Sequence, residues 1–330
     1  MLPLFFVGLV LAATPTASDW PDYLKQYRYD CPGPLDATMK PRKLTIAKRV
    51  YTHQGYKLVL DDKQAGKGAK VGVISASKEM VASTLENIKA ALAWFKKEQV
   101  HWIIVNGDMT TDAFDIETLF GLLGDTEVGV LVNMGNGDSF GVWNRIFRRK
   151  SGQYPNVINA SYIRHIVADG VEFWILPGYY DKRFLHQTGA CRYNKKDVRE
   201  MKVKLRKAGD KPTVLVSHGP PRGYGREAID WISEGENIGD IAINKLLQKH
   251  DIKFGLFSHI LEAGGKAVGS DFKTAVGERK GVQSLYVNTG SISGDPWPMN
   301  SGKTSYGMAA IVEYKNENSK FWLKRFPSRH

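Results

Sequence analysis

From residue 70 onward, short apolar segments alternate with amphipathic ones, and this alternation constrains the fold more than any other feature. Six segments are typical of buried strands: 70–76, 101–108, 128–136, 171–178, 212–220 and 252–260. The segment after the first strand places apolar side chains at helical spacing, at Val81, Leu85, Ile88, Leu92 and Phe95. Strands that alternate with helices predict an α/β domain with a largely parallel sheet.

The C-terminal part changes character. Segments 284–293, 307–314 and 320–326 have the pattern of strands joined by turns, with 315–319 as a hairpin loop. The domain is therefore expected to end in antiparallel strands. Because the chain of 330 residues has no internal repeat and no low-complexity linker, we expect one domain over 70–330 and an N-terminal extension over 19–69.

The first eighteen residues are apolar and uncharged, with small residues near their end, which is typical of a signal peptide. We therefore expect an exported protein, periplasmic or secreted, although a buried N-terminal element is the alternative. The apolar run is too short to remain as a transmembrane span in the mature chain. Cys31 and Cys191 fit either one disulfide or two buried thiols, and their spacing does not decide between them.

The chain carries 46 basic and 34 acidic residues, a formal net charge of +12. Such a charge attracts anions, whether a phosphorylated ligand or an anionic surface. Nucleic acid is not indicated specifically, since the basic segments 145–150 and 194–207 also fit a solvated surface. A nucleotide-binding P-loop is excluded because Trp297 stands where that motif requires the glycine ahead of Gly302-Lys303-Thr304.

Polar side chains follow four of the expected strands, at Asp108, Asn136, His218 and His259. Taken singly, each is typical of a turn or of a hydrogen-bonded residue. Because functional groups in α/β sheets gather at the carboxyl ends of the strands, we expect all four to approach one point. Two imidazoles, a carboxylate and an amide oxygen suit manganese, iron or zinc. The pattern therefore predicts a site for a divalent transition metal.

The order and spacing of these groups resemble the calcineurin-like metallophosphoesterases, from about residue 70 to the C-terminus. That family's pattern runs Asp-x-His, Gly-Asp, Gly-Asn-His-Asp/Glu, a His at a strand end, and Gly-His-x-His. Gly107-Asp108 matches the second element and His218 the strand-end His, while 258–261 takes the place of Gly-His-x-His. The resemblance implies a two-sheet α/β sandwich that holds two metals bridged by Asp108 and a hydroxide.

The departures from the family pattern concern one metal. The ligands that the resemblance assigns to that metal alone are replaced by Ala76, Lys78 and Leu261, which we call the altered site. The ligands of the other metal are all present, and we call them the kept site: Asp108, Asn136, His218 and His259. Gly137 replaces the His that the family uses to orient the substrate and assist the leaving group.

The resemblance therefore implies one metal ion and impaired or lost hydrolysis of a phosphorylated or anionic ligand. Two alternatives stay open: an active mononuclear phosphoesterase, and a metal-free structural or interaction domain in which the four polar groups bond one another. Lys78 and Asp138 are candidate catalytic groups, as is His186 for proton transfer. We expect the Lys78 ammonium to approach Asp108 in place of the lost cation, so that Lys78→Ala costs stability or metal affinity; the alternative is that Lys78 only solvates a helix start.

Overall fold

The computed structural model describes residues 30–61, 63, 66–185, 189–206, 209–315 and 317–329. The expected signal peptide, residues 1–18, lies outside these ranges, and so does His186. None of the helices in the described ranges combines the length and the apolar character needed to cross a membrane.

A six-stranded sheet forms one half of the domain, in the order β17-β16-β4-β5-β6-β7. Its strands are β4 Gly68–Ile74, β5 Trp102–Asn106, β6 Gly129–Asn133, β7 Val157–Asn159, β16 Met308–Lys315 and β17 Asn318–Arg325. Strands β4 to β7 are parallel, whereas β16 and β17 form an antiparallel hairpin that pairs with β4. The expected hairpin is confirmed, since Lys315 pairs with Asn318.

A nine-stranded sheet forms the other half, in the order β1-β2-β3-β8-β9-β10-β11-β13-β12. Its strands are β1 Arg42–Ile46, β2 Arg49–Gln54, β3 Lys57–Leu60, β8 His165–Ala168, β9 Val171–Leu176, β10 Thr213–Ser217, β11 Phe254–Phe257, β12 Ala267–Val268 and β13 Leu285–Asn288. Strands β9, β10, β11 and β13 run parallel. Residues 42–60 of the N-terminal segment supply β1 to β3, and β3 pairs with β8.

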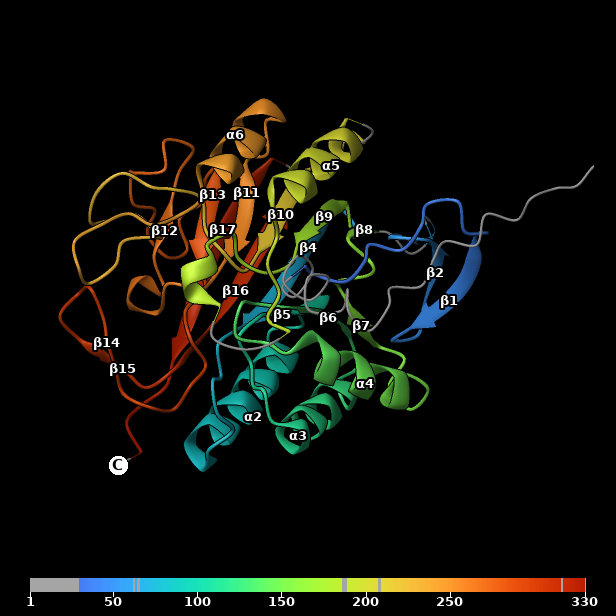
Figure 1. Ribbon diagram of the computed structural model, residues 1–330, viewed down its shortest axis with the longest axis horizontal. Coiled ribbons are helices and arrows are strands. Elements are labelled where there is room, and N and C mark those ends of the chain that lie inside the picture. Colours follow the sequence, from blue (N-terminus) through green and yellow to red (C-terminus); the bar gives the residue numbers. More distant parts are fainter. Residues whose placement is uncertain are drawn as a thin grey trace, which may run out of the picture.

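Helices cover the outer face of each sheet (Figure 1). Their bounds are α2 Ala82–Lys97, α3 Ala113–Gly124, α4 Phe140–Lys150, α5 Lys195–Leu205 and α6 Ile241–Lys249, with short 3-10 turns η2 Lys182–Phe184 and η3 Leu261–Ala263. Helices α2 to α4 share an apolar core with the six-stranded sheet, and α5 and α6 share one with the nine-stranded sheet. The expected stripe on α2 is wrong at Val81, which is exposed and precedes the helix.

The two sheets pack face to face over an apolar core to which both contribute, for example through Val71 and Trp102 from one sheet and Phe173 and Val214 from the other. This arrangement confirms the expected two-sheet α/β sandwich with antiparallel C-terminal strands. Burial of these apolar side chains supplies the main driving force that holds the two sheets together. The carboxyl ends of the parallel strands in both sheets are thereby fixed relative to each other.

Cys31 and Cys191 form a disulfide. Of the two possibilities left open by the sequence, the structure has the cross-link, and it ties the segment ahead of β1 to the segment ahead of α5. A parallel bridge between Asp30 and Arg192 lies beside it.

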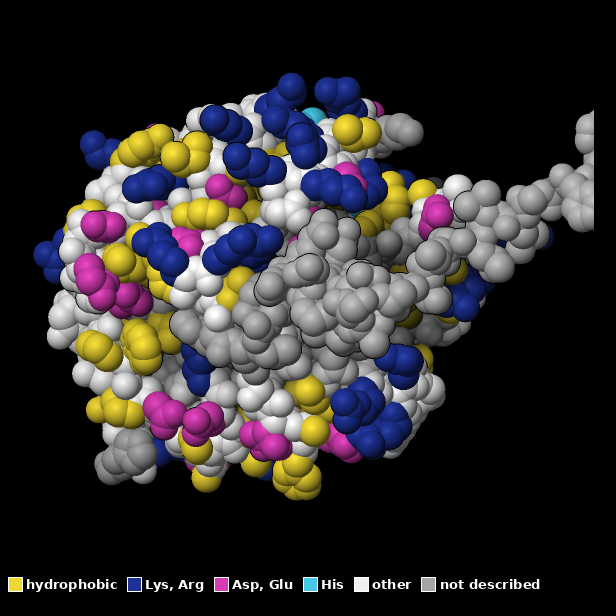
Figure 2. Space-filling view, in the orientation of Figure 1, with side chains coloured by type: hydrophobic (Ala, Val, Ile, Leu, Met, Phe, Trp, Pro, Cys, Tyr) yellow, Lys and Arg dark blue, Asp and Glu magenta, His cyan; other side chains and the backbone are white. Residues whose placement is uncertain are grey.

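Basic side chains gather over α5 and α6 and near the C-terminal end of α4, as Figure 2 shows. The last turn of α4 holds Arg148, Arg149 and Lys150, and the last two pair with Glu117 of α3. The basic segments of the sequence therefore lie on the helices of the outer layers, interspersed with acidic groups.

Candidate metal centre

The four residues of the kept site follow strands of both sheets. Asp108 and Asn136 follow β5 and β6 of the six-stranded sheet, whereas His218 and His259 follow β10 and β11 of the nine-stranded sheet. Asn106, the last residue of β5, ties the two edges together. Its Nδ2 donates to the carbonyl of Ser217, 2.9 Å away, and to Oγ of Ser258, 3.1 Å away.

Asp108, His218 and His259 form a compact group in which one possible ligand atom of each lies within 4.8 Å of the others. His218 and Asp108 are buried. His218 Nδ1 lies 2.8 Å from the carbonyl oxygen of Asn106, so this nitrogen carries the proton and donates it there. Nε2 is left to face Asp108 Oδ1, 3.3 Å away, without a well-aligned hydrogen bond among the described residues. A backbone carbonyl that orients one imidazole nitrogen is a common support for a metal ligand.

Asn136 follows β6 of the six-stranded sheet. Its side chain is buried, and Nδ2 donates to the carbonyl of Phe184, 2.5 Å away. In the described part of the chain, Oδ1 has no hydrogen-bond partner. A buried acceptor without a partner is costly and unusual, so this oxygen is a candidate to bind a group that the protein does not itself supply, such as a metal ion. The triad itself offers two imidazole nitrogens and a carboxylate oxygen, a mixture that suits a divalent transition metal.

The carboxylate of Asp108 is held by three groups. Lys78 Nζ donates to Oδ2 at 2.7 Å, the backbone N–H of Gly137 donates to Oδ1 at 2.7 Å, and His218 faces Oδ1. Burial opposes ionisation of Asp108, but His218 and Lys78 outweigh it and hold the pKa of this carboxyl well below its usual range. The expected approach of the Lys78 ammonium to Asp108 is thus confirmed.

At the altered site, the ammonium group of Lys78 is paired with Asp108. Ala76 is fully buried and offers only a methyl group, and Leu261 begins η3 with its side chain buried. The backbone is left-handed at Ala76 and Lys78, with φ of 49° and 58°, and also at Asp108 and His259, with φ of 57° and 62°. Such conformations are uncommon for residues other than glycine and tend to cluster at functional sites.

Gly137 stands where a side chain would crowd the site. A Cβ atom at this position would lie 3.0 Å from Asp108 Oδ1, which is closer than side chains normally approach. The glycine therefore lets the backbone N–H reach the carboxylate. In the Gly-Asn-Gly-Asp sequence of residues 135–138, the glycine at 137 is therefore needed for the hydrogen bond that positions Asp108.

Asp138 holds the backbone around the site. Its carboxylate accepts hydrogen bonds from the backbone N–H groups of Asp108, Met109 and Gly135, at 2.7 to 2.9 Å. Burial, and then the negative charge of Asp108, raise the pKa of Asp138 to about 6. Because both oxygens accept hydrogen bonds from the backbone, Asp138 fixes the position of the loops that carry Asp108 and Gly135.

Three further residues shape the site without having been singled out in the sequence. The ring of Tyr179 lies 3.8 Å from that of His259, centroid to centroid, and the ring of Phe184 lies 5.4 Å from it. Asn106 is the third, through its bonds to both sheet edges. Asn106 could have been found from the sequence, because it is a polar residue at the end of an apolar strand. Nothing in the sequence pattern indicated Tyr179 or Phe184.

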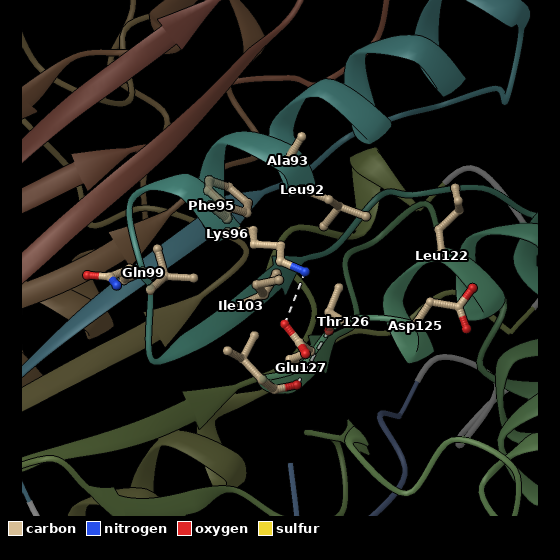
Figure 3. Close-up of a pocket in the computed structure, with 12 residues that line it drawn as sticks. Leu92, Ala93, Phe95, Lys96, Gln99, Ile103, Leu122, Asp125, Thr126 and Glu127 are labelled. Carbon is tan, nitrogen blue, oxygen red and sulfur yellow. Dashed lines mark hydrogen bonds and ion pairs between the residues drawn. The ribbon is translucent and has the colours of Figure 1, made fainter. Parts of the chain in front are cut away.

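A groove of about 510 Å³ lies away from this centre, between α2 and α3 (Figure 3). Residues that precede β5 and β6 line it, including Gln99, Val100 and Val128. Lys96 and Glu127 form an ion pair at 3.1 Å beside it. The groove is therefore at the amino ends of these strands, opposite the polar strand ends.

The family model of the calcineurin-like phosphoesterases matches residues 81–263, more than half of the chain. The chain belongs to this family. The match includes all four residues of the kept site and Leu261 of the altered site, whereas Ala76 and Lys78 precede it. No curated protein sequence matches the chain significantly.

Several solved structures are similar to this chain at low sequence identity, and two of them reach a TM-score of 0.5. One has a TM-score of 0.56 at 14% identity, with 79% of this chain and 100% of that chain covered. GAP50, described as the anchor in the inner membrane complex of Plasmodium, has a TM-score of 0.50 at 14% identity, with 80% and 86% covered. A dimetal phosphatase from Danio rerio has a TM-score of 0.48 at 10% identity, with 78% and 99% covered.

Proposed function

We propose that this protein is an exported member of the calcineurin-like phosphoesterase family that binds a single divalent transition metal and a phosphorylated or other anionic ligand, with hydrolysis impaired or lost. The observation that carries the proposal is the contrast between the two sites. Asp108, His218 and His259 lie together with ligand atoms within 4.8 Å of one another, whereas Lys78 forms an ion pair with Asp108 on the side of the altered site.

The residues expected to hold the metal are Asp108, Asn136, His218 and His259. Manganese, iron and zinc all suit this mixture of imidazole nitrogens with carboxylate and amide oxygens. When bound, such an ion acts as a Lewis acid on a phosphoryl oxygen. A second ion, which in two-metal sites helps to clamp the attacking and leaving oxygens, would meet Ala76, Lys78 and Leu261 here, none of which is a usual metal ligand.

The chain's own groups support ligand binding better than turnover. The side chain of Lys78 is 43% exposed, so a charged side chain beside Asp108 can be reached by an anion from solvent. Gly137 cannot orient a substrate or donate a proton from a side chain. Losing one such preorganised group typically lowers a rate on the order of a hundredfold to a thousandfold, and here both the second cation and the His are missing.

Export is supported by the disulfide between Cys31 and Cys191, because such bonds persist mainly in oxidising compartments. The apolar N-terminal residues of the sequence agree with it.

The test combines ligand binding with turnover on the full chain loaded with manganese or zinc. Calorimetry with inorganic phosphate measures binding, and an aryl phosphate monoester and diester measure hydrolysis. We expect phosphate to bind in a metal-dependent way, hydrolysis to be absent or very slow, and His259→Ala to abolish binding. His250→Ala, at the end of α6, is the matched control.

Two outcomes would favour the alternatives. Robust metal-dependent hydrolysis that His259→Ala abolishes would make the protein an active mononuclear phosphoesterase. Absence of both metal and phosphate binding would instead favour a metal-free structural or interaction domain.

A further inference from the structure

A small cavity of about 210 Å³ adjoins the altered site. Lys78 and Leu261 line it, and Lys78 is also the residue that binds Asp108. The cavity is therefore connected to the candidate metal centre through a shared side chain. Its volume is below the range of about 300 to 1,000 Å³ that is usual for drug-sized ligands, so it suits a smaller molecule.

Most of the other groups around the cavity are polar. They are the side chains of Glu79, Ser291, Ser293, Asp295 and Ser305, with Trp297 and Gly307 beside them. Ser291 and Ser293 are almost fully buried, whereas Asp295 is exposed. Ser293 is linked to Asp295, since its Oγ accepts from the backbone N–H of Asp295 at 3.2 Å. Hydroxyl and carboxylate oxygens of this kind can accept hydrogen bonds from hydroxyl groups of a ligand.

Trp297 lines the cavity from a short hairpin that is hydrogen-bonded to the rest of the domain. It belongs to the short hairpin of β14 Trp297–Pro298 and β15 Thr304–Ser305. Asn300, in the turn of this hairpin, donates from Nδ2 to the carbonyl of Trp231 at 2.6 Å and from its backbone N–H to the carbonyl of Glu262 at 2.9 Å. Trp297 is nevertheless 41% exposed as a residue. An exposed Trp on a fixed wall of a polar cavity offers a flat apolar surface with a single N–H donor.

The cavity lining carries charges of both signs. Lys78 supplies an ammonium group that is paired with Asp108, while Glu79 and Asp295 contribute carboxylates. An oxyanion is favoured beside the ammonium, and a second anionic group is disfavoured near the carboxylates. The cavity thus suits a molecule with one anionic end and a neutral body that carries hydroxyl groups.

We propose that this cavity binds the hydroxylated organic part of a small phosphate monoester, such as a sugar phosphate, whose phosphate group lies at Lys78 and the kept site. The inference rests on the proposed function, because it takes phosphate binding there as given, and it adds the class of ligand. Trp297 packs against the carbon skeleton, and Asp295 accepts hydrogen bonds from the ligand's hydroxyl groups. Leu261 provides an apolar contact where the family pattern has a metal ligand.

The experiment compares four probes on the metal-loaded full chain by calorimetry: inorganic phosphate, glycerol 3-phosphate, glucose 6-phosphate and glucose. We expect at least one of the two phosphate esters to bind about tenfold more tightly than inorganic phosphate, and glucose to bind far more weakly than either ester. Trp297→Ala and Asp295→Ala should each bring the affinity for that ester close to the affinity for inorganic phosphate. Phe114→Ala, which removes an aromatic ring that is 78% exposed on α3, is the matched control and should leave the preference intact.

The outcomes separate this inference from the function on which it rests. If inorganic phosphate binds but neither ester binds more tightly, or if both variants retain the preference, the cavity does not select the organic part and the inference is wrong. If none of the four probes binds the metal-loaded protein, phosphate recognition itself is wrong and the inference falls with it.

Discussion

Replacing Lys78 by methionine removes the ammonium group while keeping a side chain of similar length. In the metal-free protein this leaves the carboxylate of Asp108, which is 3% exposed, without its cationic partner at 2.7 Å. Loss of one partner of a fully buried pair costs about 3 to 5 kcal/mol, whereas exposed pairs contribute about 0 to 1 kcal/mol. Because Lys78 is 43% exposed, we expect the free energy of unfolding to fall by about 1 to 3 kcal/mol.

Metal binding should respond in the opposite direction. A metal held by Asp108 would share this carboxylate with the ammonium of Lys78, and two cations on one carboxylate repel each other. From the sequence we expected that removing Lys78 would lower either stability or metal affinity. The geometry predicts instead that stability falls and metal affinity rises. Lys78→Met should bind zinc or manganese about tenfold more tightly than the natural chain, so that metal stabilises the variant more.

Urea unfolding with and without metal measures both effects. The matched control is Lys96→Met, which removes the same charge from a pair with Glu127 whose side chains are 78% and 67% exposed. This control should change the free energy of unfolding by less than about 1 kcal/mol. An Lys78→Met variant as stable as the control would refute the idea that Lys78 stands in for the lost cation. A variant that binds metal more weakly than the natural chain would refute the competition between Lys78 and the metal for Asp108.

Three other changes test neighbouring parts of the account. Gly137→Ala should weaken metal binding in a titration by about tenfold, because its Cβ would press on the Asp108 carboxylate, which is held from three sides. The control Gly141→Ala, whose Cβ meets nothing within 4 Å, should leave metal affinity unchanged. Equal affinities of the two variants would show that Asp108 can move aside. Replacing Cys31 and Cys191 by serine should lower the free energy of unfolding by about 2 to 5 kcal/mol in urea, since the bond closes a loop of 160 residues, and a loss under about 1 kcal/mol would contradict this. The combined variant Ala76→Asp, Lys78→His and Leu261→His, which keeps Gly137 because a Cβ there would press on Asp108, should raise the metal content towards two and create or increase hydrolysis of an aryl phosphate. A variant that stays at one ion would show that the altered site lacks more than its ligands.

The strand ends could be predicted from the sequence because two local signals coincide there. An apolar run marks each buried strand, and a polar residue at its end marks the sheet edge, as at Asp108 and His218. The approach of Lys78 to Asp108 required the family resemblance, since apolar periodicity carries no information on the direction of a loop side chain. The site therefore followed from the order of the elements together with the resemblance.

The packing face of α2 could be predicted only in part. Ile88 and Phe95 are buried as expected, and Leu92 packs against the core while only partly buried. Leu85 is also only partly buried, whereas the polar side chains of Thr84 and Asn87 are buried. Thr84 Oγ1 accepts from the backbone N–H of Gly294 at 2.9 Å, and Asn87 Nδ2 donates to the carbonyl of Tyr306 at 2.7 Å. These bonds join residues far apart in the chain, so a hydrophobic pattern read locally does not reveal them.

The same reason explains what was missed at the metal centre. Phe184 reaches Asn136 through its backbone carbonyl, and Asn106 reaches the ends of β10 and β11, which lie more than a hundred positions later in the sequence. Residue type and spacing identify candidate ligands, whereas the groups that hold them in place depend on how the two sheets meet.

The metal content of the purified chain tests the central claim most directly. After loading with manganese or zinc and removal of unbound ions, elemental analysis should give about one ion per chain. His218→Ala should lower this content sharply, because it removes one of the four proposed ligands. A content near two ions per chain would contradict the loss of the altered site, and a content near zero would contradict the survival of the kept one.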